Sequence, residues 1–306
     1  LLIYLPLNAK QPVPLFSILN FSGNHTVHLD PEIALPRGEL RPKDKELKRG
    51  DSAKGYPIEL ILDAGYGFAT VGYCDIDPDW RDGYPLGVRA LYNPSGDEAR
   101  DAWGAVGAWA WGLSRIVDYI ETDSSIDSSR VAAAGHSRLG KTALWAAAQD
   151  PRFAFAVSNN SGCTGAAVSR SKQGETVKAI NDRFPHWFCA RYKDYNDKED
   201  SLPVDQHLLI ALLAPRPVYV ASATEDLWAD PRAEFDACVR ATPVYSLLGQ
   251  TGLPSSRFPQ PEQPVTGGQI GYHLRTGEHR LTEYDWRNYI AFADRFIGGR
   301  PRETRR

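Results

Sequence analysis

The sequence predicts an α/β fold in which helices cover both faces of a mostly parallel central sheet, as in a three-layer sandwich. Two features of the chain lead to this prediction. Short apolar runs, typical of buried parallel strands, are followed by longer segments with apolar residues at helical spacing. Strands and helices that alternate in this way form parallel sheets, because each helix returns the chain along one face of the sheet.

The predicted strands are short and are bounded by Gly, Pro, Asn or Asp, the residues that favour turns. The clearest strand lies just before Gly135, where small and β-branched side chains follow one another (VAAA). In chain order the predicted strands cover residues 1–5, 14–21, 67–73, 131–134, 155–158, 216–223 and 269–274.

The predicted helices have apolar residues three and four positions apart. The first predicted helix covers residues 102–119 and contains Trp103, Trp109 and Trp111, and another helix begins at Leu139. A loop as long as the polar segment that follows residue 165 usually serves a function in a compact domain. The further helices are at 205–213, about 232–241 and 282–296, with a connector at 126–130 and long loops at 75–99 and 166–206.

The chain shows no internal repeat and no linker, so we expect a single domain over residues 1–306. It opens inside a strand-like run without a starting Met, and we therefore expect that N-terminal residues of the natural protein precede it. The charged run 41–49 is predicted to be solvated surface. Residues 299–306 are basic and are predicted to form a frayed tail.

The composition excludes several classes of function. A net charge of −3 gives no reason to expect a nucleic-acid partner, and no run approaches the 18 apolar residues of a membrane span. The four cysteines are widely spaced without a C-x-x-C pair, so neither a zinc site nor a disulfide framework is indicated. Eight Trp and fourteen Tyr suit a cleft that binds sugar rings, although we expect most of them in the core.

Ser137 lies between the predicted strand at 131–134 and the helix that begins at Leu139. A serine at a sharp strand-to-helix turn is a nucleophile elbow, because the turn exposes the hydroxyl and the helix amides stabilise an oxyanion. The usual elbow reads G-x-S-x-G; here Gly135 fits, but the second glycine is displaced by one position to Gly140. The alternative is that Ser137 is an ordinary helix N-cap.

An acid and a histidine follow Ser137 at the ends of later predicted strands. The acidic pair Glu225 and Asp226 comes first, and His279 comes last, in a loop beside a glycine. Serine, acid and histidine in this order are typical of the α/β-hydrolase fold. We favour Asp226 over Glu225 as the acid, and we expect Asp230 to cap a helix. The other histidines are expected to be structural, and the side chain of the histidine before Ser137 is expected to point away from the site.

The segment 135–141 (GHSRLGK) resembles the G-x-S-R-x-G-K signature of the glucuronoyl esterases, carbohydrate esterase family 15, which accounts for the displaced glycine. The resemblance extends over nearly the whole chain and is closest to bacterial members. The other similar segments are 20–26 (NFSGNHT), 108–115 (AWAWGLSR), 184–188 (FPHWF), 205–207 (DQH), 225–231 (EDLWADP) and 279–286 (HRLTEYDW).

The resemblance implies an α/β-hydrolase that acts as a 4-O-methyl-glucuronoyl methylesterase-like enzyme. Such an enzyme cleaves the ester between a 4-O-methyl-glucuronate on xylan and a lignin alcohol. Carried onto this sequence, Ser137 is the nucleophile and His279 is the general base. Arg138 stabilises the oxyanion through its amide and its guanidinium, a contribution typically worth roughly 3–4 kcal/mol.

The resemblance also implies that Lys141 binds sugar hydroxyls and that Glu175 and Trp228 supply the remaining contacts to the uronate. No metal and no organic cofactor is implied. The implied partner is glucuronoxylan or a lignin–carbohydrate ester, without nucleic acid or membrane. We expect a monomer, and by resemblance a secreted or periplasmic one.

One position departs from the pattern of many relatives. They carry the triad glutamate in an S-x-E-S-G-like turn, whereas residues 158–162 read SNNSG, with Asn160 at that position. An amide cannot stabilise an imidazolium, so the acid must come from Asp226 or Glu225. Two alternatives stay open: an acetyl or other carbohydrate esterase of the same fold, and a weakened enzyme that binds saccharides without turnover.

Overall fold

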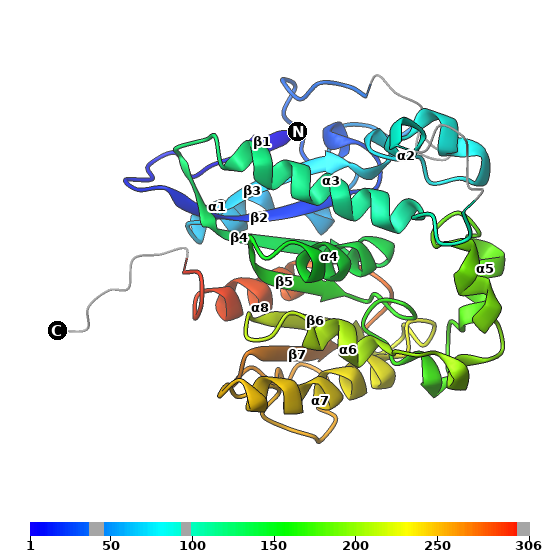
Figure 1. Cartoon of the computed structure of the whole chain (residues 1–306). Coiled ribbons are helices and arrows are strands. Elements are labelled where there is room, and N and C mark those ends of the chain that lie inside the picture. The colour runs from blue at the N-terminus through cyan, green and yellow to red at the C-terminus, as the bar shows by residue number, and fades with distance from the viewer. Residues whose placement is uncertain (37–45, 93–98, 299–306) are drawn as a thin grey trace.

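The computed structural model describes residues 1–36, 46–92 and 99–298. Its centre is a seven-stranded sheet in the order β1-β3-β2-β4-β5-β6-β7, in which every neighbouring pair is parallel except β1 and β3 (Figure 1). The predicted parallel sheet is therefore confirmed. The strands are β1 (Leu2–Tyr4), β2 (Val13–Asn20), β3 (Gly67–Gly72), β4 (Ile126–His136), β5 (Phe153–Asn159), β6 (Val218–Ala223) and β7 (Ile270–Arg275).

Helices cover both faces of the sheet, and the alternation of side chains along each strand decides which face a residue serves. In β4, Val131 and Ala133 pack into a cluster with helices on one face of the sheet, whereas Ala132 and Ala134 pack into a second cluster with helices on the other face. The first face is covered by α3 (Ala105–Ile120), α4 (Arg138–Gln149), α6 (Gln206–Ala211) and α7 (Pro231–Leu247), and the second by α1 (Ile58–Asp63) and α8 (Glu283–Ala293).

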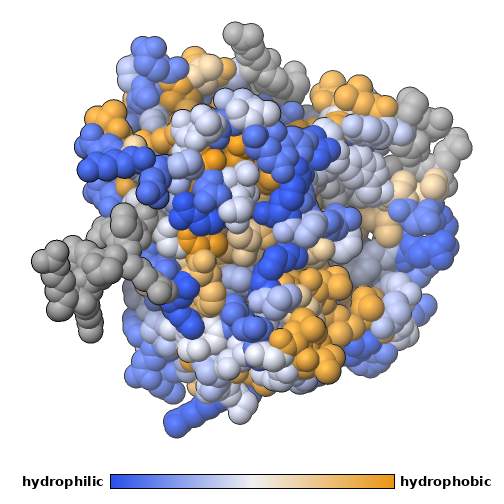
Figure 2. Space-filling model, turned by 60° about the vertical axis from the view of Figure 1, so that its left-hand side comes forward, coloured by the Kyte–Doolittle hydropathy of each residue, from blue (hydrophilic) through white to orange (hydrophobic). Residues whose placement is uncertain are grey.

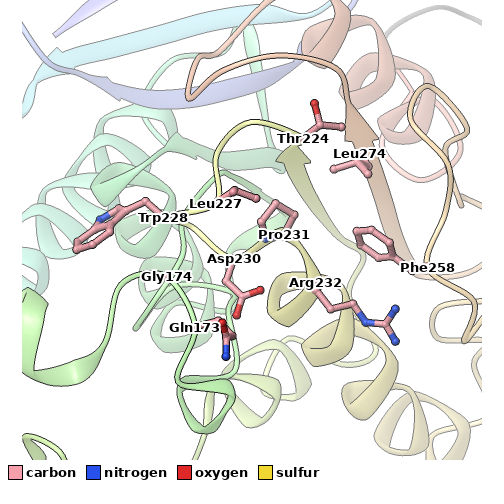
Figure 3. Close-up of a pocket in the computed structure, with 10 residues that line it drawn as sticks. All are labelled: Gln173, Gly174, Thr224, Leu227, Trp228, Asp230, Pro231, Arg232, Phe258 and Leu274. Atoms are coloured by element: carbon pink, nitrogen blue, oxygen red, sulfur yellow. The ribbon is translucent and has the colours of Figure 1, made fainter.

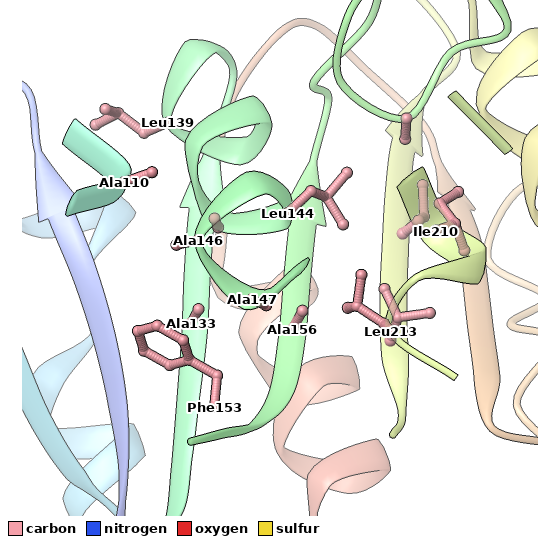
Figure 4. Packing of buried hydrophobic residues seen from close by; sticks show 14 of the residues in the cluster. Ala110, Ala133, Leu139, Leu144, Ala146, Ala147, Phe153, Ala156, Ile210 and Leu213 are labelled. Atoms are coloured by element: carbon pink, nitrogen blue, oxygen red, sulfur yellow. The ribbon is translucent and has the colours of Figure 1, made fainter. Parts of the chain in front are cut away.

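The first cluster explains why the elbow is held firmly. Small residues of β4, β5 and α4 (Ala133, Ala156, Ala147) let the helix pack close to the sheet, and Leu144 and Phe153 fill the remaining space (Figure 4). All five side chains are fully or almost fully buried. The helix that follows Ser137 is thus fixed against the centre of the sheet rather than at its edge.

Several predicted boundaries were wrong. Residues 126–130, predicted as a connector, are the first half of β4, and the predicted loops at 75–99 and 166–206 contain two short helices, α2 (Val88–Tyr92) and α5 (Val177–Arg183). Helix α7 continues through Pro243 to Leu247 instead of ending near residue 241. The tail 299–306 and most of the charged run 41–49 lie outside the described residues.

The surface mixes polar and apolar residues. On the face shown in Figure 2, hydrophilic residues are interspersed with several hydrophobic groups, the most extended of which lies at the lower right. Among the described residues, no helix is both long and apolar enough to cross a membrane. All four cysteines are free thiols, two of them buried.

Candidate active site

Ser137 forms the turn between β4 and α4. Its backbone has φ 58° and ψ −129°, a strained conformation for a residue with a side chain, and its hydroxyl makes no cap hydrogen bond to α4. A Cβ on Gly135 would lie 1.9 Å from the carbonyl oxygen of Leu139, and one on Gly140 would lie 3.0 Å from the Cβ of Ser161. A side chain at residue 135 would collide with the backbone of α4, and one at residue 140 would crowd Ser161. With its strained backbone and no cap hydrogen bond, Ser137 is therefore a nucleophile elbow rather than an ordinary N-cap.

The structure brings His279 to Asp226 and not to Glu225. Nδ1 of His279 lies 2.5 Å from Oδ2 of Asp226, which is buried, whereas the side chain of Glu225 is exposed. Burial alone would raise the pKa of Asp226, but the hydrogen bond and the charge of His279 outweigh it, so the pKa lies below that of an ordinary aspartate. Ser137, Asp226 and His279 all line one hollow.

Asn160 reaches the same carboxylate from the neighbouring strand end. Its Nδ2 donates to Oδ2 of Asp226 over 2.8 Å, and its backbone adopts the left-handed conformation that asparagine tolerates (φ 46°). The turns after β5 and β6 therefore converge on one acid. Asn160 does not replace the missing glutamate, but it gives the carboxylate of Asp226 a second fixed donor beside His279.

The turn that carries Asn160 rests on Glu234, a fully buried residue of α7. Oε1 of Glu234 accepts from the amides of Ser161 (2.8 Å) and Gly162 (2.9 Å), while Oε2 accepts from the hydroxyl of Ser222 (2.6 Å). Burial raises the pKa of Glu234 to about 7 despite these donors, and the nearby carboxylate of Asp226 adds to the increase. The sequence contained no signal for this residue.

This raised pKa predicts a dependence of stability on pH. The folded state holds the proton of Glu234 more tightly than the unfolded state does, and this difference stabilises the fold. The contribution is fully present below about pH 4.5 and is lost as the pH rises through about 7. Glu234→Gln keeps the shape of the side chain but cannot titrate. Between pH 5 and 8 its free energy of unfolding should therefore fall less than that of the parent protein, and the difference should be on the order of 3 kcal/mol. Urea denaturation at the two pH values checks this; parallel changes in both proteins would contradict it.

The guanidinium of Arg138, the residue after the nucleophile, is held in place beside the hollow. It forms an ion pair with buried Asp79 and lies over the rings of Phe184 and Trp187, 5.2 and 4.7 Å from their centres. Burial alone would raise the pKa of Asp79. The hydrogen bond from His186 and the charge of Arg138 outweigh this effect, so the pKa of Asp79 lies well below that of an ordinary aspartate. A cation fixed here can stabilise negative charge that develops on a bound ester.

Lys141, Glu175 and Trp228 form a chain of contacts across the far wall of the hollow. The ammonium of Lys141 donates to Oε2 of Glu175 (3.1 Å), and Nε1 of Trp228 donates to Oε1 of the same carboxylate (3.1 Å). Lys141 also donates to the carbonyls of Ser161 and Cys163, both at 2.6 Å, so its three hydrogens are in use. A sugar hydroxyl that binds Lys141 must share or displace the longer bond to Glu175.

One prediction about the histidines was wrong. His136 does not point away from the site: its ring centre lies 4.6 Å from that of His279, and its Nδ1 lies 2.6 Å from the side-chain oxygen of Asn159. Burial and the neighbouring His279 lower the pKa of His136 to about 3. His136 is therefore a neutral wall behind the imidazole of His279. Asp230, by contrast, caps α7 through the amide of Ala233 as predicted.

The hollow is small and adjoins a larger one. Its volume is about 280 Å³. Trp228 also lines a second hollow of about 700 Å³, whose walls include Leu227, Phe258 and Leu274 (Figure 3). Around the first hollow the structure gathers all the predicted site residues except Glu225; it is lined by Ser137, Arg138, Lys141, Asn160, Ser161, Gly162, Glu175, Arg183, Phe184, Trp187, Asp226, Trp228, Ala229 and His279.

This arrangement is suited to acyl transfer. A strained serine, an imidazole with one nitrogen fixed by a buried carboxylate, and a cation beside the serine are the parts of a serine hydrolase. In the described part of the chain, no group of three or more His, Cys, Asp or Glu side chains is placed to hold a metal ion.

Comparisons with known proteins agree with this chemistry. A family model described as "Glucuronyl esterase, fungi" matches residues 90–249. Carbohydrate esterase MZ0003, from an unknown prokaryotic organism, is 52% identical over 98% of this chain and 71% of its own length. The 4-O-methyl-glucuronoyl methylesterase 1 of Phanerochaete chrysosporium is 30% identical over 76% of this chain and 50% of its own length.

Solved structures give the same result. A promiscuous CE15 esterase from a marine bacterial metagenome superposes with a TM-score of 0.89 at 51% identity, covering 96% of this chain and 76% of that one. The glucuronoyl esterase from Solibacter usitatus superposes with a TM-score of 0.90 at 46% identity, covering 95% and 76%. The chain therefore belongs to carbohydrate esterase family 15, the family of the glucuronoyl esterases.

Proposed function

We propose that this chain hydrolyses esters of glucuronic acid and 4-O-methyl-glucuronic acid through an acyl-enzyme on Ser137. One observation carries the proposal: the pair Asp226–His279 and the chain of contacts through Glu175 line the same small hollow as the serine. The first supplies the machinery for ester cleavage. The second supplies polar groups in the same hollow that a sugar ring can bind and a simple acyl group would not use.

The catalytic steps follow from the contacts. Because Nδ1 of His279 is bound to Asp226, its Nε2 is the nitrogen that accepts the proton of Ser137 as the hydroxyl attacks the ester carbonyl. The oxyanion is stabilised by the amide and the guanidinium of Arg138. His279 then protonates the departing alcohol, and a water activated by the same imidazole releases the uronic acid.

The natural substrate in this proposal is the ester that joins a glucuronate side group of xylan to a lignin alcohol. The relatives named 4-O-methyl-glucuronoyl methylesterase support the uronate part. The promiscuous relative supports a second candidate, in which the chain also accepts other carbohydrate esters. The saccharide-binding protein without turnover is disfavoured, because Asp226 supplies the acid that Asn160 lacks.

The proposal is tested by comparing benzyl glucuronate with p-nitrophenyl acetate, an ester without a sugar. In Glu175→Gln, kcat/KM for benzyl glucuronate should fall about 10- to 100-fold, since a hydrogen bond to a charged group contributes roughly 1.5–3 kcal/mol. Hydrolysis of p-nitrophenyl acetate should change less than about threefold, because the acetyl group does not reach Glu175.

Two results would oppose the proposal. Equal losses on both esters would mean that Glu175 only supports the loop and does not contact substrate. Turnover of acetylated xylan by the parent protein without turnover of benzyl glucuronate would replace the uronate esterase by an acetyl esterase.

We also propose that the enzyme acts outside the cytoplasm, in the periplasm or secreted. The support is the substrate class, since a lignin-linked polysaccharide does not enter a cell. Fractionation of the producing organism, with antibodies to this chain, tests it; recovery of the protein only with cytoplasmic markers would refute the location and leave the activity unaffected.

A further inference from the structure

His279 sits in a short loop between β7 and α8 that has no regular backbone pairing of its own. The loop turns at Gly277, which has φ 113°, and its first part is attached to the strand end before Asp226: Gly277 donates to the hydroxyl of Thr224 and accepts from the amide of Glu225. These contacts end two residues before His279. The imidazole itself is about two-fifths exposed, so packing alone does not fix it.

A single buried guanidinium holds the remainder of this loop. Nη2 of Arg275 donates to the carbonyls of Glu278 (2.7 Å) and Arg280 (2.6 Å), the two residues that flank His279. Nη1 donates to the carbonyl of Thr276 (3.2 Å). The peptide groups on both sides of the histidine are thus bound to one rigid, planar group, which presents several donors in fixed directions.

Arg275 is in turn fixed by Asp285, a fully buried residue of α8. Nε of Arg275 donates to Oδ2 of Asp285 (3.1 Å), and His273 of β7 contacts the other oxygen, Oδ1, at 2.8 Å. The same Oδ2 accepts from the amide and hydroxyl of Thr282, which closes the capping box of α8. The loop, the strand before it and the helix after it therefore meet at one ion pair.

We propose that Arg275 is a positioning residue for the reaction: it sets the place of the His279 imidazole between Asp226 and Ser137. It touches neither substrate nor reacting atoms. Because reaction rates depend on the alignment of the reacting groups to within about 1 Å, a loosened loop lowers the rate of the chemical step while the uronate contacts on other loops stay intact. The inference concerns the proposed esterase, but it depends only on a Ser137–His279 pair.

Arg275→Lys tests the inference, because it keeps the positive charge but lacks the fork that spans Asp285 and the loop carbonyls. We expect the rate of Ser137 labelling by a fluorophosphonate, and kcat for benzyl glucuronate, to fall about 10- to 100-fold, with KM changed less than about threefold. In Arg275→Ala, guanidinium chloride at about 20 mM, far below denaturing concentrations, should restore part of the labelling rate, since it can occupy the vacated site.

Arg216 provides a matched control. Its guanidinium also binds three backbone carbonyls, those of Ala147, Asp150 and Phe153, but it precedes β6 and so lies at the opposite end of the sheet from the site. Arg216→Lys should lower the thermal midpoint as Arg275→Lys does while leaving the labelling rate within about twofold of the parent.

The outcomes separate this inference from the proposed function. A folded Arg275→Lys protein that is labelled as fast as the parent overturns the inference, as does a loss in Arg216→Lys of the same size. A parent protein that is labelled but does not hydrolyse glucuronate esters overturns the proposed function and leaves the role of Arg275 supported if the labelling rates differ as expected.

Discussion

Ser137→Ala is expected to lower kcat for benzyl glucuronate by about 10⁴- to 10⁶-fold, the largest effect of any single substitution in this chain. Without the hydroxyl no acyl-enzyme forms, and what remains is the binding and the oxyanion stabilisation around Arg138. The fold should be unaffected, since the hydroxyl makes no cap hydrogen bond and alanine enters the same backbone turn. Steady-state hydrolysis and fluorophosphonate labelling measure the two losses.

Binding of free glucuronate is the control for this variant. The groups at the far wall, Lys141, Glu175 and Trp228, are untouched, so calorimetry should show the affinity of the parent within about threefold. Turnover that persists in Ser137→Ala, with labelling at another residue, would show that the elbow serine is not the nucleophile.

Much of the fold and of the triad could be predicted because the signals are local. The run of small residues before Gly135 predicted a buried strand, and the chain order of Ser137, Asp226 and His279 predicted the hydrolase topology before any contact was known. The displaced glycine also has a local reason in the structure: Gly140 faces Ser161 across a distance that a side chain would close.

The supporting residues could not be predicted, because they act through contacts between distant loops. Asp79 lies 59 positions from its ion-pair partner Arg138, and Glu234 lies 73 positions from the turn at Ser161. None of them belongs to a periodic pattern. Arg275 came directly after the predicted strand 269–274, and only the three-dimensional course of the next five residues shows what its guanidinium binds.

The choice between the two acids illustrates the same limit. Glu225 and Asp226 are adjacent, so their spacing from Ser137 and His279 hardly distinguishes them. In the structure the turn after β6 buries Asp226 and exposes Glu225. Asp226→Asn should therefore lower kcat by about 10⁴-fold, because an amide leaves the imidazolium without its counter-charge and favours the wrong tautomer of His279. Glu225→Gln, the matched control one position away, should stay within about twofold. Full activity of both variants would remove Asp226 from the triad.

Asn160 makes a stricter test possible. Its amide lies 2.8 Å from the carboxylate oxygen that binds His279, so a glutamate at this position would bring a carboxylate to the same imidazole from the neighbouring strand end. Asn160→Glu combined with Asp226→Asn should recover about 10- to 100-fold of the lost kcat. Recovery stays partial because glutamate tolerates the left-handed backbone of residue 160 less well than asparagine.

Asn160→Glu alone should destabilise the protein, since two buried carboxylates then face each other. A double variant no more active than Asp226→Asn would mean that the turn after β5 cannot supply an acid in this chain.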